Sequence, residues 1–294
     1  MKKYFVCSDI HSYFDEWISS LNEAGYQKDN SEHILIILGD LFDRGKKPWE
    51  IYQFISSLPE DRVVLIKGNH EYLLLELVKR KFPYDYDFSN GTYDTLIHLY
   101  KDPRKARKDW IKRHSSKNTS DDSEIFFASY EYYQKVEKRL YDNPKINVLV
   151  DWINSSRWLN YYELGQYIFV HSFIPLKGVD NIYSMNSKGE YYQNWRNETD
   201  PKRWEMATWG CPYQRYLDGN FVEELNKGKI LVCGHWHTSD FFNKLLYYGQ
   251  QHMDYRKENP IFRSANYPGL IAIDACTAAT HKANVLVINE EELV

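Results

Sequence analysis

The chain has 294 residues, of which 43% are hydrophobic and 27% are charged, and its formal net charge is −4. This composition excludes wholesale disorder, a fibrous protein and a strongly basic nucleic-acid coat protein. No apolar run approaches the ~20 residues of a membrane span. The apolar run at the start is interrupted by Asp9 and His11, so we predict no signal peptide. The four cysteines form no Cys-x-x-Cys pair, which favours reduced thiols and a cytoplasmic location.

The first 80 residues alternate between strand-like and helix-like patterns. Short apolar runs predict strands at residues 4–7, 34–38 and 63–66. Apolar residues recur at helical spacing between Phe14 and Leu21, Pro48 suits the first turn of a second helix, and a third helix is predicted to begin near Tyr72. Strands separated by helices in this way predict βαβ units and a parallel sheet.

Residues from about 82 to 160 break this rhythm, because they are polar, rich in tyrosine and helical in pattern, as at 131–140. Between Lys101 and Lys117 there are eight Lys or Arg against two Asp, a local charge of +6. This basic block either attracts nucleotides or nucleic acid or is a solvated helical face. Strands are predicted again at 167–170, 230–233, 270–273 and 284–288. We therefore predict a single domain over 1–294 with a helical insertion at about 82–160.

A polar cluster follows each predicted strand of the first half. These clusters are Asp9-Ile10-His11, the run from Gly39 to Gly45, and Gly68-Asn69-His70-Glu71. Later strands end in His171 and in Gly234-His235-Trp236-His237. Each motif alone is also compatible with a turn, a helix cap or a surface loop. Because ligands of open α/β sheets gather beyond the carboxyl ends of the strands, the clusters are expected to converge. Asp, His and Asn donors without thiolates suit Mn, Fe or Zn, and their number favours two ions over one.

These segments resemble the calcineurin-like metallophosphoesterases and, within them, the phosphoprotein phosphatase branch. The resemblance covers roughly 200 residues, from 3 to about 80 and from about 165 to 288. It implies an α/β fold in which a two-sheet β-sandwich, flanked by helices, carries a dinuclear metal site at one end.

The resemblance also implies a set of metal ligands. They would be Asp9 and His11 on the first ion, Asn69, His171 and His235 on the second, and Asp40 on both. His237 is a further candidate ligand of the first ion, the alternative being a histidine that lies beside the ligands. The cofactors would be two divalent ions, with Mn first and Fe or Zn as alternatives.

The implied mechanism is attack on phosphorus by a bridging hydroxide that the two metals generate at neutral pH. Arg44, with its planar fork of donors, would neutralise the phosphoryl oxygens, and Asn69 would also contact the substrate. His70 would protonate the leaving group, and Asp43 would orient that imidazole and raise its pKa. A second phosphate-binding arginine is expected among Arg196, Arg203 and Arg215, of which Arg215 is our candidate.

Three functions remain open from the sequence. The combination of Asp43-Arg44-Gly45 with Gly68-Asn69-His70-Glu71 favours a serine/threonine protein phosphatase acting on a phosphoprotein or a small phosphoester. The alternative is a symmetrical diadenosine tetraphosphate hydrolase or another nucleotide phosphohydrolase. Such relatives usually lack the Asp before Arg-Gly, although the block from Lys101 to Lys117 would attract polyphosphates. A non-enzymatic scaffold is disfavoured because none of the six family ligands is missing.

Overall fold

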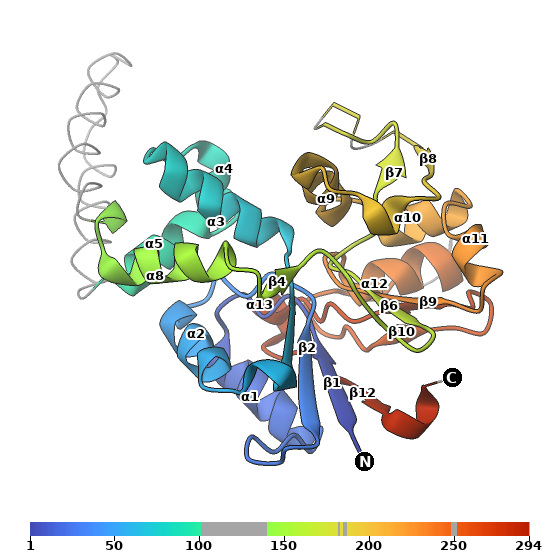
Figure 1. Cartoon of the computed structure of the whole chain (residues 1–294), viewed down its shortest axis with the longest axis horizontal. Coiled ribbons are helices and arrows are strands. Elements are labelled where there is room, and N and C mark those ends of the chain that lie inside the picture. The colour runs from blue at the N-terminus through green and yellow to red at the C-terminus, as the bar shows by residue number, and fades with distance from the viewer. Residues whose placement is uncertain (101–139, 182, 185–186, 248–251, 294) are drawn as a thin grey trace.

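The computed structural model describes residues 1–100, 140–181, 183–184, 187–247 and 252–293. It contains two five-stranded sheets with helices outside them (Figure 1). The first sheet has the strand order β12 (Leu286–Asn289), β1 (Lys3–Cys7), β2 (His33–Ile37), β3 (Val63–Ile66) and β4 (Trp158–Leu159). Strands β1 to β4 run parallel, and β12 is antiparallel to β1. The predicted parallel β1–β2–β3 arrangement is therefore confirmed.

The second sheet has the order β10 (Phe262–Arg263), β11 (Leu270–Ala272), β9 (Ile230–Cys233), β6 (Tyr167–Phe169) and β5 (Tyr162–Leu164). Its three central strands are parallel, and its two edge strands are antiparallel to their neighbours. A separate hairpin pairs β7 (Leu176–Lys177) with β8 (Glu190–Tyr191). The two-residue strands and β5 were not predicted, because they are too short to show a periodicity.

The core follows from the alternation of side chains along each strand. On β1, Tyr4 and Val6 belong to the apolar layer that contains residues of both sheets. Phe5 and Cys7 on the same strand pack instead with the helices outside the first sheet. Both faces of these strands are covered, which explains why they read as continuous apolar runs rather than as alternating ones.

Helices cover the outer face of each sheet. Over the first sheet lie α1 (Phe14–Glu23), α2 (Pro48–Ser56), α3 (Asn69–Arg80), α4 (Asp85–Ser89), α5 (Thr92–Leu99) and α8 (Pro144–Ile153). Over the second lie α9 (Pro201–Thr208), α10 (Pro212–Leu217), α11 (Val222–Leu225) and α12 (Thr238–Phe241). A short helix, α13 (Thr277–Thr280), follows β11. Turns of 3-10 helix lie at Glu60–Arg62, Trp195–Asn197 and Glu290–Glu292, and a π-helical turn at Phe242–Leu246.

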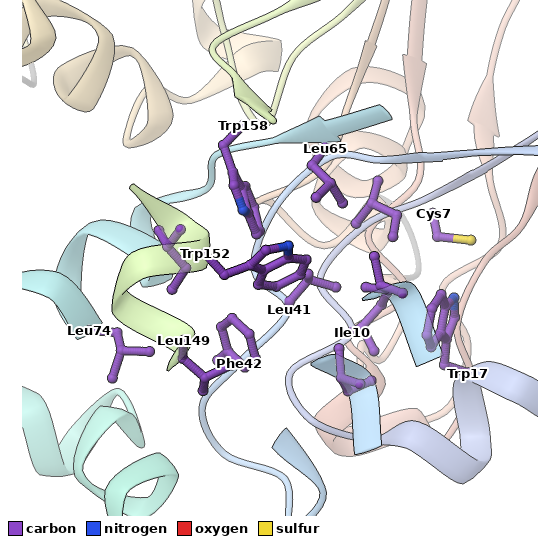
Figure 2. Packing of buried hydrophobic residues seen from close by; sticks show 14 of the residues in the cluster. Cys7, Ile10, Trp17, Leu41, Phe42, Leu65, Leu74, Leu149, Trp152 and Trp158 are labelled. Carbon is purple, nitrogen blue, oxygen red and sulfur yellow. The ribbon is translucent and has the colours of Figure 1, made fainter. Parts of the chain in front are cut away.

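The segment predicted as an insertion is described only at its two ends. Residues 101–139 lie outside the described residues, and with them the basic block from Lys101 to Lys117 and most of the helical pattern at 131–140. The described ends hold α4, α5, α8 and β4. Trp152 of α8 packs against Phe42 and Trp158 in the main core (Figure 2). The division into one domain with an insertion stays a prediction. In the part of the chain that the structure describes, no helix is long and apolar enough to cross a membrane.

Candidate metal centre

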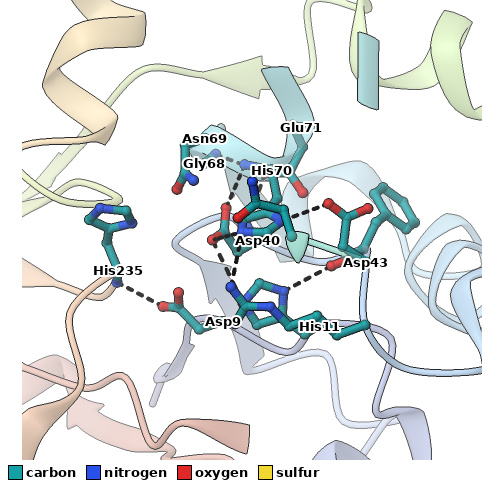
Figure 3. Close-up of polar contacts among 12 residues, drawn as sticks. Asp9, His11, Asp40, Asp43, Gly68, Asn69, His70, Glu71 and His235 are labelled. Atoms are coloured by element: carbon teal, nitrogen blue, oxygen red, sulfur yellow. Dashed lines mark hydrogen bonds and ion pairs between the residues drawn. The ribbon is translucent and has the colours of Figure 1, made fainter. Parts of the chain in front are cut away.

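The loops that follow β1, β2 and β9 turn sharply where the strands end. Asp9, His11, Asp40 and His235 all have positive φ angles, between 49° and 64°. Such left-handed conformations are uncommon for residues other than glycine and persist only where the surroundings hold them. One such restraint is the backbone bond from the N–H of His11 to the carbonyl of Asp40, with a length of 2.9 Å. The strained turns bring polar side chains that follow separate strands close together (Figure 3).

The loops that follow β2 and β3 approach each other so closely that only glycine fits at the contact. A Cβ atom on Gly68 would overlap Oδ1 of Asp40, and one on Gly39 would overlap the backbone nitrogen of Gly68. The side chain of Glu71 fastens the same two loops together. It accepts hydrogen bonds from the N–H groups of Gly68 (2.8 Å), Asp40 (2.9 Å) and Leu41 (2.9 Å). Helix α3 begins at Asn69, three residues before the predicted start, because Glu71 binds the backbone ahead of the first turn.

Asp40 lies between two groups of possible metal donors. One group is His11, Asp40 and His70, and the other is Asp40, His171 and His235. The donor atoms of each group lie within 4.8 Å of one another. Oδ2 of Asp40 is 3.8 Å from Nε2 of His11, whereas Oδ1 is 3.5 Å from Nε2 of His171. The two carboxylate oxygens therefore face different groups, which is the geometry that a ligand shared by two ions needs.

Backbone carbonyls orient two of the histidines. Nδ1 of His11 is 3.0 Å from the carbonyl oxygen of Phe42, and Nδ1 of His171 is 2.6 Å from that of Leu38. Nε2 of each ring is thereby directed at the two donor groups. Metal-bound histidines are usually oriented in this way, by a hydrogen bond from the ring nitrogen that does not bind the metal. Nε2 of His171 lies 2.8 Å from Oδ1 of Asn69, so these two side chains are adjacent.

Burial keeps two of the histidine donors in the neutral form that a metal ion binds, whereas it opposes ionisation of the Asp40 carboxyl group. Burial lowers the pKa of His11 and of His235, and nearby positive groups add to the shift, so both rings are neutral at pH 7. Burial raises the pKa of Asp40, although His70 opposes the shift. Neutral ring nitrogens, a buried carboxylate and an amide oxygen form the donor set that borderline divalent ions prefer. The residues present therefore fit a two-ion centre.

Asp9 and His237 hold less central positions. Oδ2 of Asp9 accepts a hydrogen bond from the N–H of His235 (2.9 Å) and another from the hydroxyl of Ser8, so Asp9 joins the ends of β1 and β9. The ring of His237 stacks on that of Tyr255 at 5.5 Å. Among the described residues, neither side chain belongs to the two converging donor groups. Their assignment as ligands stays a prediction.

His70, Asp43 and Arg44 form a linked group beside these donors. Nδ1 of His70 lies 2.6 Å from Oδ2 of Asp43. Arg44 reaches Nε2 of His11 (3.0 Å) with one guanidinium nitrogen and Nε2 of His70 (3.3 Å) with the other. Burial would lower the pKa of His70, but the charge of Asp40 and the contact with Asp43 raise it overall. Nε2 of His70 is also 3.8 Å from Oδ2 of Asp40, so the ring lies nearer to the donors than a purely peripheral acid would.

Arg215 lies apart from this group. Its guanidinium is buried and donates hydrogen bonds to the carbonyls of Ser187 and Lys188. It lines a pocket of about 290 Å³ together with Trp209 and Trp236. Its role in substrate binding stays a prediction. The other arginines considered from the sequence are paired with carboxylates, Arg196 with Glu163 and Glu224, and Arg203 with Glu198.

Three buried residues of the site were missed from the sequence. Thr92 and Thr95 on α5 both bind the carboxylate of Asp43. Asp274, just beyond the end of β11, accepts a hydrogen bond from the N–H of Cys276 (2.7 Å), and burial together with the neighbouring Asp9 raises its pKa. Asp274 obeys the same strand-end rule as the other clusters and was detectable in that way. The threonines carry no comparable signal.

Comparison with known proteins agrees with this geometry. A sequence model described as calcineurin-like phosphoesterase matches residues 2–239. The chain belongs to this family. A crystal structure of a point mutant of a cold-active protein tyrosine phosphatase superposes with a TM-score of 0.51 at 14% identity, covering 99% of this chain and 76% of that one. At such low identity the likeness concerns the fold alone.

The curated relatives match shorter stretches. A symmetrical bis(5'-nucleosyl)-tetraphosphatase of Buchnera aphidicola is 38% identical over 77 residues, which is 26% of each chain. The asymmetrical bis(5'-nucleosyl)-tetraphosphatase PrpE of Bacillus velezensis is 36% identical over 74 residues, 23% of this chain and 30% of the relative. The chain thus spans less than a third of the length of these two relatives. The family to which the chain belongs is one of metal-dependent phosphoesterases.

Proposed function

We propose that the chain is a phosphomonoesterase of the serine/threonine protein phosphatase type, in which His70 protonates the leaving alkoxide. The observation that carries the proposal is the buried pair of His70 and Asp43, whose atoms lie 2.6 Å apart. An alkoxide is strongly basic, so its departure benefits from a positioned acid. A carboxylate that binds Nδ1 leaves Nε2 as the atom that delivers the proton.

Arg44 supplies the positive charge that would hold the phosphoryl group. Its two guanidinium nitrogens lie 3.0 Å from Nε2 of His11 and 3.3 Å from Nε2 of His70, beside the donor groups. A planar guanidinium can grip two phosphoryl oxygens at once, and it stays charged at every relevant pH. Asn69, whose Oδ1 lies 2.8 Å from Nε2 of His171, would contact the substrate or a metal ion.

The metals would be held by Asp9, His11, Asp40, Asn69, His171 and His235, with His237 as a further candidate. Two divalent ions bound there would activate water and offset the charge of the phosphoryl group. We propose Mn for both positions, with Fe or Zn as alternatives.

A second candidate is hydrolysis of nucleoside polyphosphates, as named for the curated relatives. It is favoured by the pocket of about 290 Å³ lined by Trp209, Trp236 and Lys188. The ring of Trp209 lies 5.9 Å from that of His235, so the pocket adjoins the donor group. Indole rings can stack a base, and a lysine can pair with phosphate. A phosphate leaving group is weakly basic, however, and makes little use of His70.

The test is a phosphate-release screen with added Mn, using phosphoserine peptides, nucleotides and diadenosine tetraphosphate. We expect the highest kcat/KM on the phosphopeptides. The Asp40→Asn variant should hydrolyse none of the substrates. A clear preference for the dinucleoside polyphosphate would favour the second candidate. Absence of hydrolysis of every substrate with Mn, Fe and Zn would contradict both.

A further inference from the structure

Two threonines of α5 bind the carboxylate of Asp43, which also contacts His70. The hydroxyl of Thr92 donates to Oδ2 (2.8 Å) and that of Thr95 donates to Oδ1 (2.8 Å). The oxygen of Thr95 also accepts a hydrogen bond from the N–H of Asp43 (2.9 Å). All three residues are fully buried. Thr95 therefore fixes both the backbone and the side chain of Asp43.

The turn before α5 also restrains the backbone of the neighbouring arginine. The N–H of Arg44 points to the carbonyl of Gly91 at 3.4 Å, and a Cβ atom on Gly91 would lie only 2.6 Å from the nitrogen of Arg44. Asp43 and Arg44 both have positive φ angles, 74° and 60°. Conformations of this kind persist where tertiary contacts impose them, and the start of α5 supplies these contacts.

The hydrogen bonds from the two threonines determine how the carboxylate of Asp43 is oriented toward the imidazole of His70. Oδ1 is taken by Thr95, and Oδ2 is shared between Thr92 and Nδ1 of His70. Because both hydroxyls donate to it, the carboxylate accepts on both oxygens and cannot rotate without breaking a buried bond. Its direction toward Nδ1 is thereby set, and Nε2 of His70 is left facing the centre.

We propose that Thr92 and Thr95 are positioning residues for the proton donor and that they act through Asp43. The proposal rests on the proposed function, in that it requires His70 to protonate the leaving group. It gives the start of α5, within the segment that the sequence marks as an insertion, a part in catalysis. Neither threonine contacts the substrate or the metal donors in this role.

The experiment compares two kinds of variant. Thr92→Val and Thr95→Val keep the shape of the side chain and lose its hydroxyl group. Thr92→Ser and Thr95→Ser keep the hydroxyl group. Each is assayed on an alkyl phosphate and on nitrophenyl phosphate. Loss of a hydrogen bond to a buried charged group typically has an effect of ~10–100-fold. We expect a loss of this order in kcat on the alkyl phosphate for the Val variants, a much smaller one on nitrophenyl phosphate, and recovery in the Ser variants.

A double-mutant comparison separates positioning from a general structural defect. In a His70→Asn background the Val substitutions should have no further effect on kcat, because the group that they position is gone. Thr208→Val is the matched control, since this buried threonine binds the carbonyl of Glu205 instead. If Thr95→Val fails to fold because its bond to the backbone is lost, Thr92→Val and its Ser counterpart carry the test.

Two results would overturn the inference, and they differ in what else they overturn. Equal losses of Thr92→Val on both substrates, or full additivity with His70→Asn, would remove the positioning role while leaving the function of His70 intact. If His70→Asn itself showed no dependence on the leaving group, the proposed function would fail, and the positioning role with it.

Discussion

Asp43 and His70 form one buried pair, with Oδ2 of Asp43 2.6 Å from Nδ1 of His70, although they lie 27 positions apart in the chain. Their proximity follows from the sheet. Strands β2 and β3 are parallel neighbours with Ile37 beside Leu65, so the loops after the two strands leave the same edge. The pair is therefore a consequence of the βαβ topology. Helix α5 then fixes it through hydrogen bonds from Thr92 and Thr95 to the carboxylate of Asp43.

Replacing the shared carboxylate should disable both halves of the centre. We expect Asp40→Asn to abolish activity and to weaken the binding of both ions, since its oxygens face both donor groups. The exposed Asp15→Asn variant serves as the control. Metal analysis and turnover of the same preparation check the result. Two bound ions together with near-wild-type turnover would refute the shared role.

Metal removal should lower stability as well as activity. The centre gathers the buried carboxylates Asp40 and Asp274, and ions that bind only the folded state add to its stability by mass action. We expect a chelator to abolish hydrolysis and lower the melting temperature, and added Mn to restore both. Full activity in thoroughly chelated protein would show that the donors serve another purpose.

The close approach of the two loops predicts a strong effect of a single methyl group. Gly68→Ala should destabilise the protein by about 1–3 kcal/mol, the usual cost of overpacking, because the new Cβ overlaps Asp40. Gly210→Ala is the control, since its Cβ would meet its nearest neighbours at an ordinary 3.5 Å. Urea unfolding of both variants measures the difference. Equal stabilities would mean that the loops separate easily.

An ion pair between Glu224 and Arg196 predicts a pH-dependent stability. Burial opposes ionisation of Glu224, but hydrogen bonds from Arg196 and from Tyr191, Trp195 and Lys227 outweigh it and lower the pKa. The pKa in the folded state thus lies below the unfolded value of ~4.3. The stabilisation is fully present above that pH and is lost as the pH falls toward the folded pKa.

Glu224→Gln should therefore cost on the order of 2 kcal/mol at pH 7, a typical value for a buried hydrogen-bonded charge. The cost should shrink below about pH 4. The neighbouring Glu223→Gln, on the exposed side of α11, is the control. Chemical unfolding at several pH values provides the measurement. A difference that does not change with pH would show that the charge of Glu224 contributes nothing.

The sequence predicted the parts of the structure that depend on local pattern. The runs at 63–66 and 230–233 match β3 and β9 residue for residue, because both are largely buried strands with clear boundaries. Gly68-Asn69-His70-Glu71 was recognisable as a polar cluster that directly follows a predicted strand. The role of Glu71 in joining two loops was not predicted, since it depends on how β2 and β3 pair.

The remaining features depend on contacts between distant residues. Thr92 and Thr95 lie 49 and 52 positions from Asp43, and nothing in their local sequence distinguishes them from other helical threonines. The structure also brings His70 into the same donor group as His11, although motif reasoning separated the acid from the ligands.

The central claim is that His70 protonates the leaving group. The most direct test measures kcat of His70→Asn on an alkyl phosphate and on nitrophenyl phosphate, with metal analysis of the same preparation. The account predicts a loss of ~10²–10⁴-fold on the alkyl phosphate, because its alkoxide needs a proton, and a much smaller loss on nitrophenyl phosphate. Metal content should be unchanged, and Asp43→Asn should show a milder form of the same pattern. Equal losses on both substrates, accompanied by loss of metal, would contradict the account and make His70 a metal ligand.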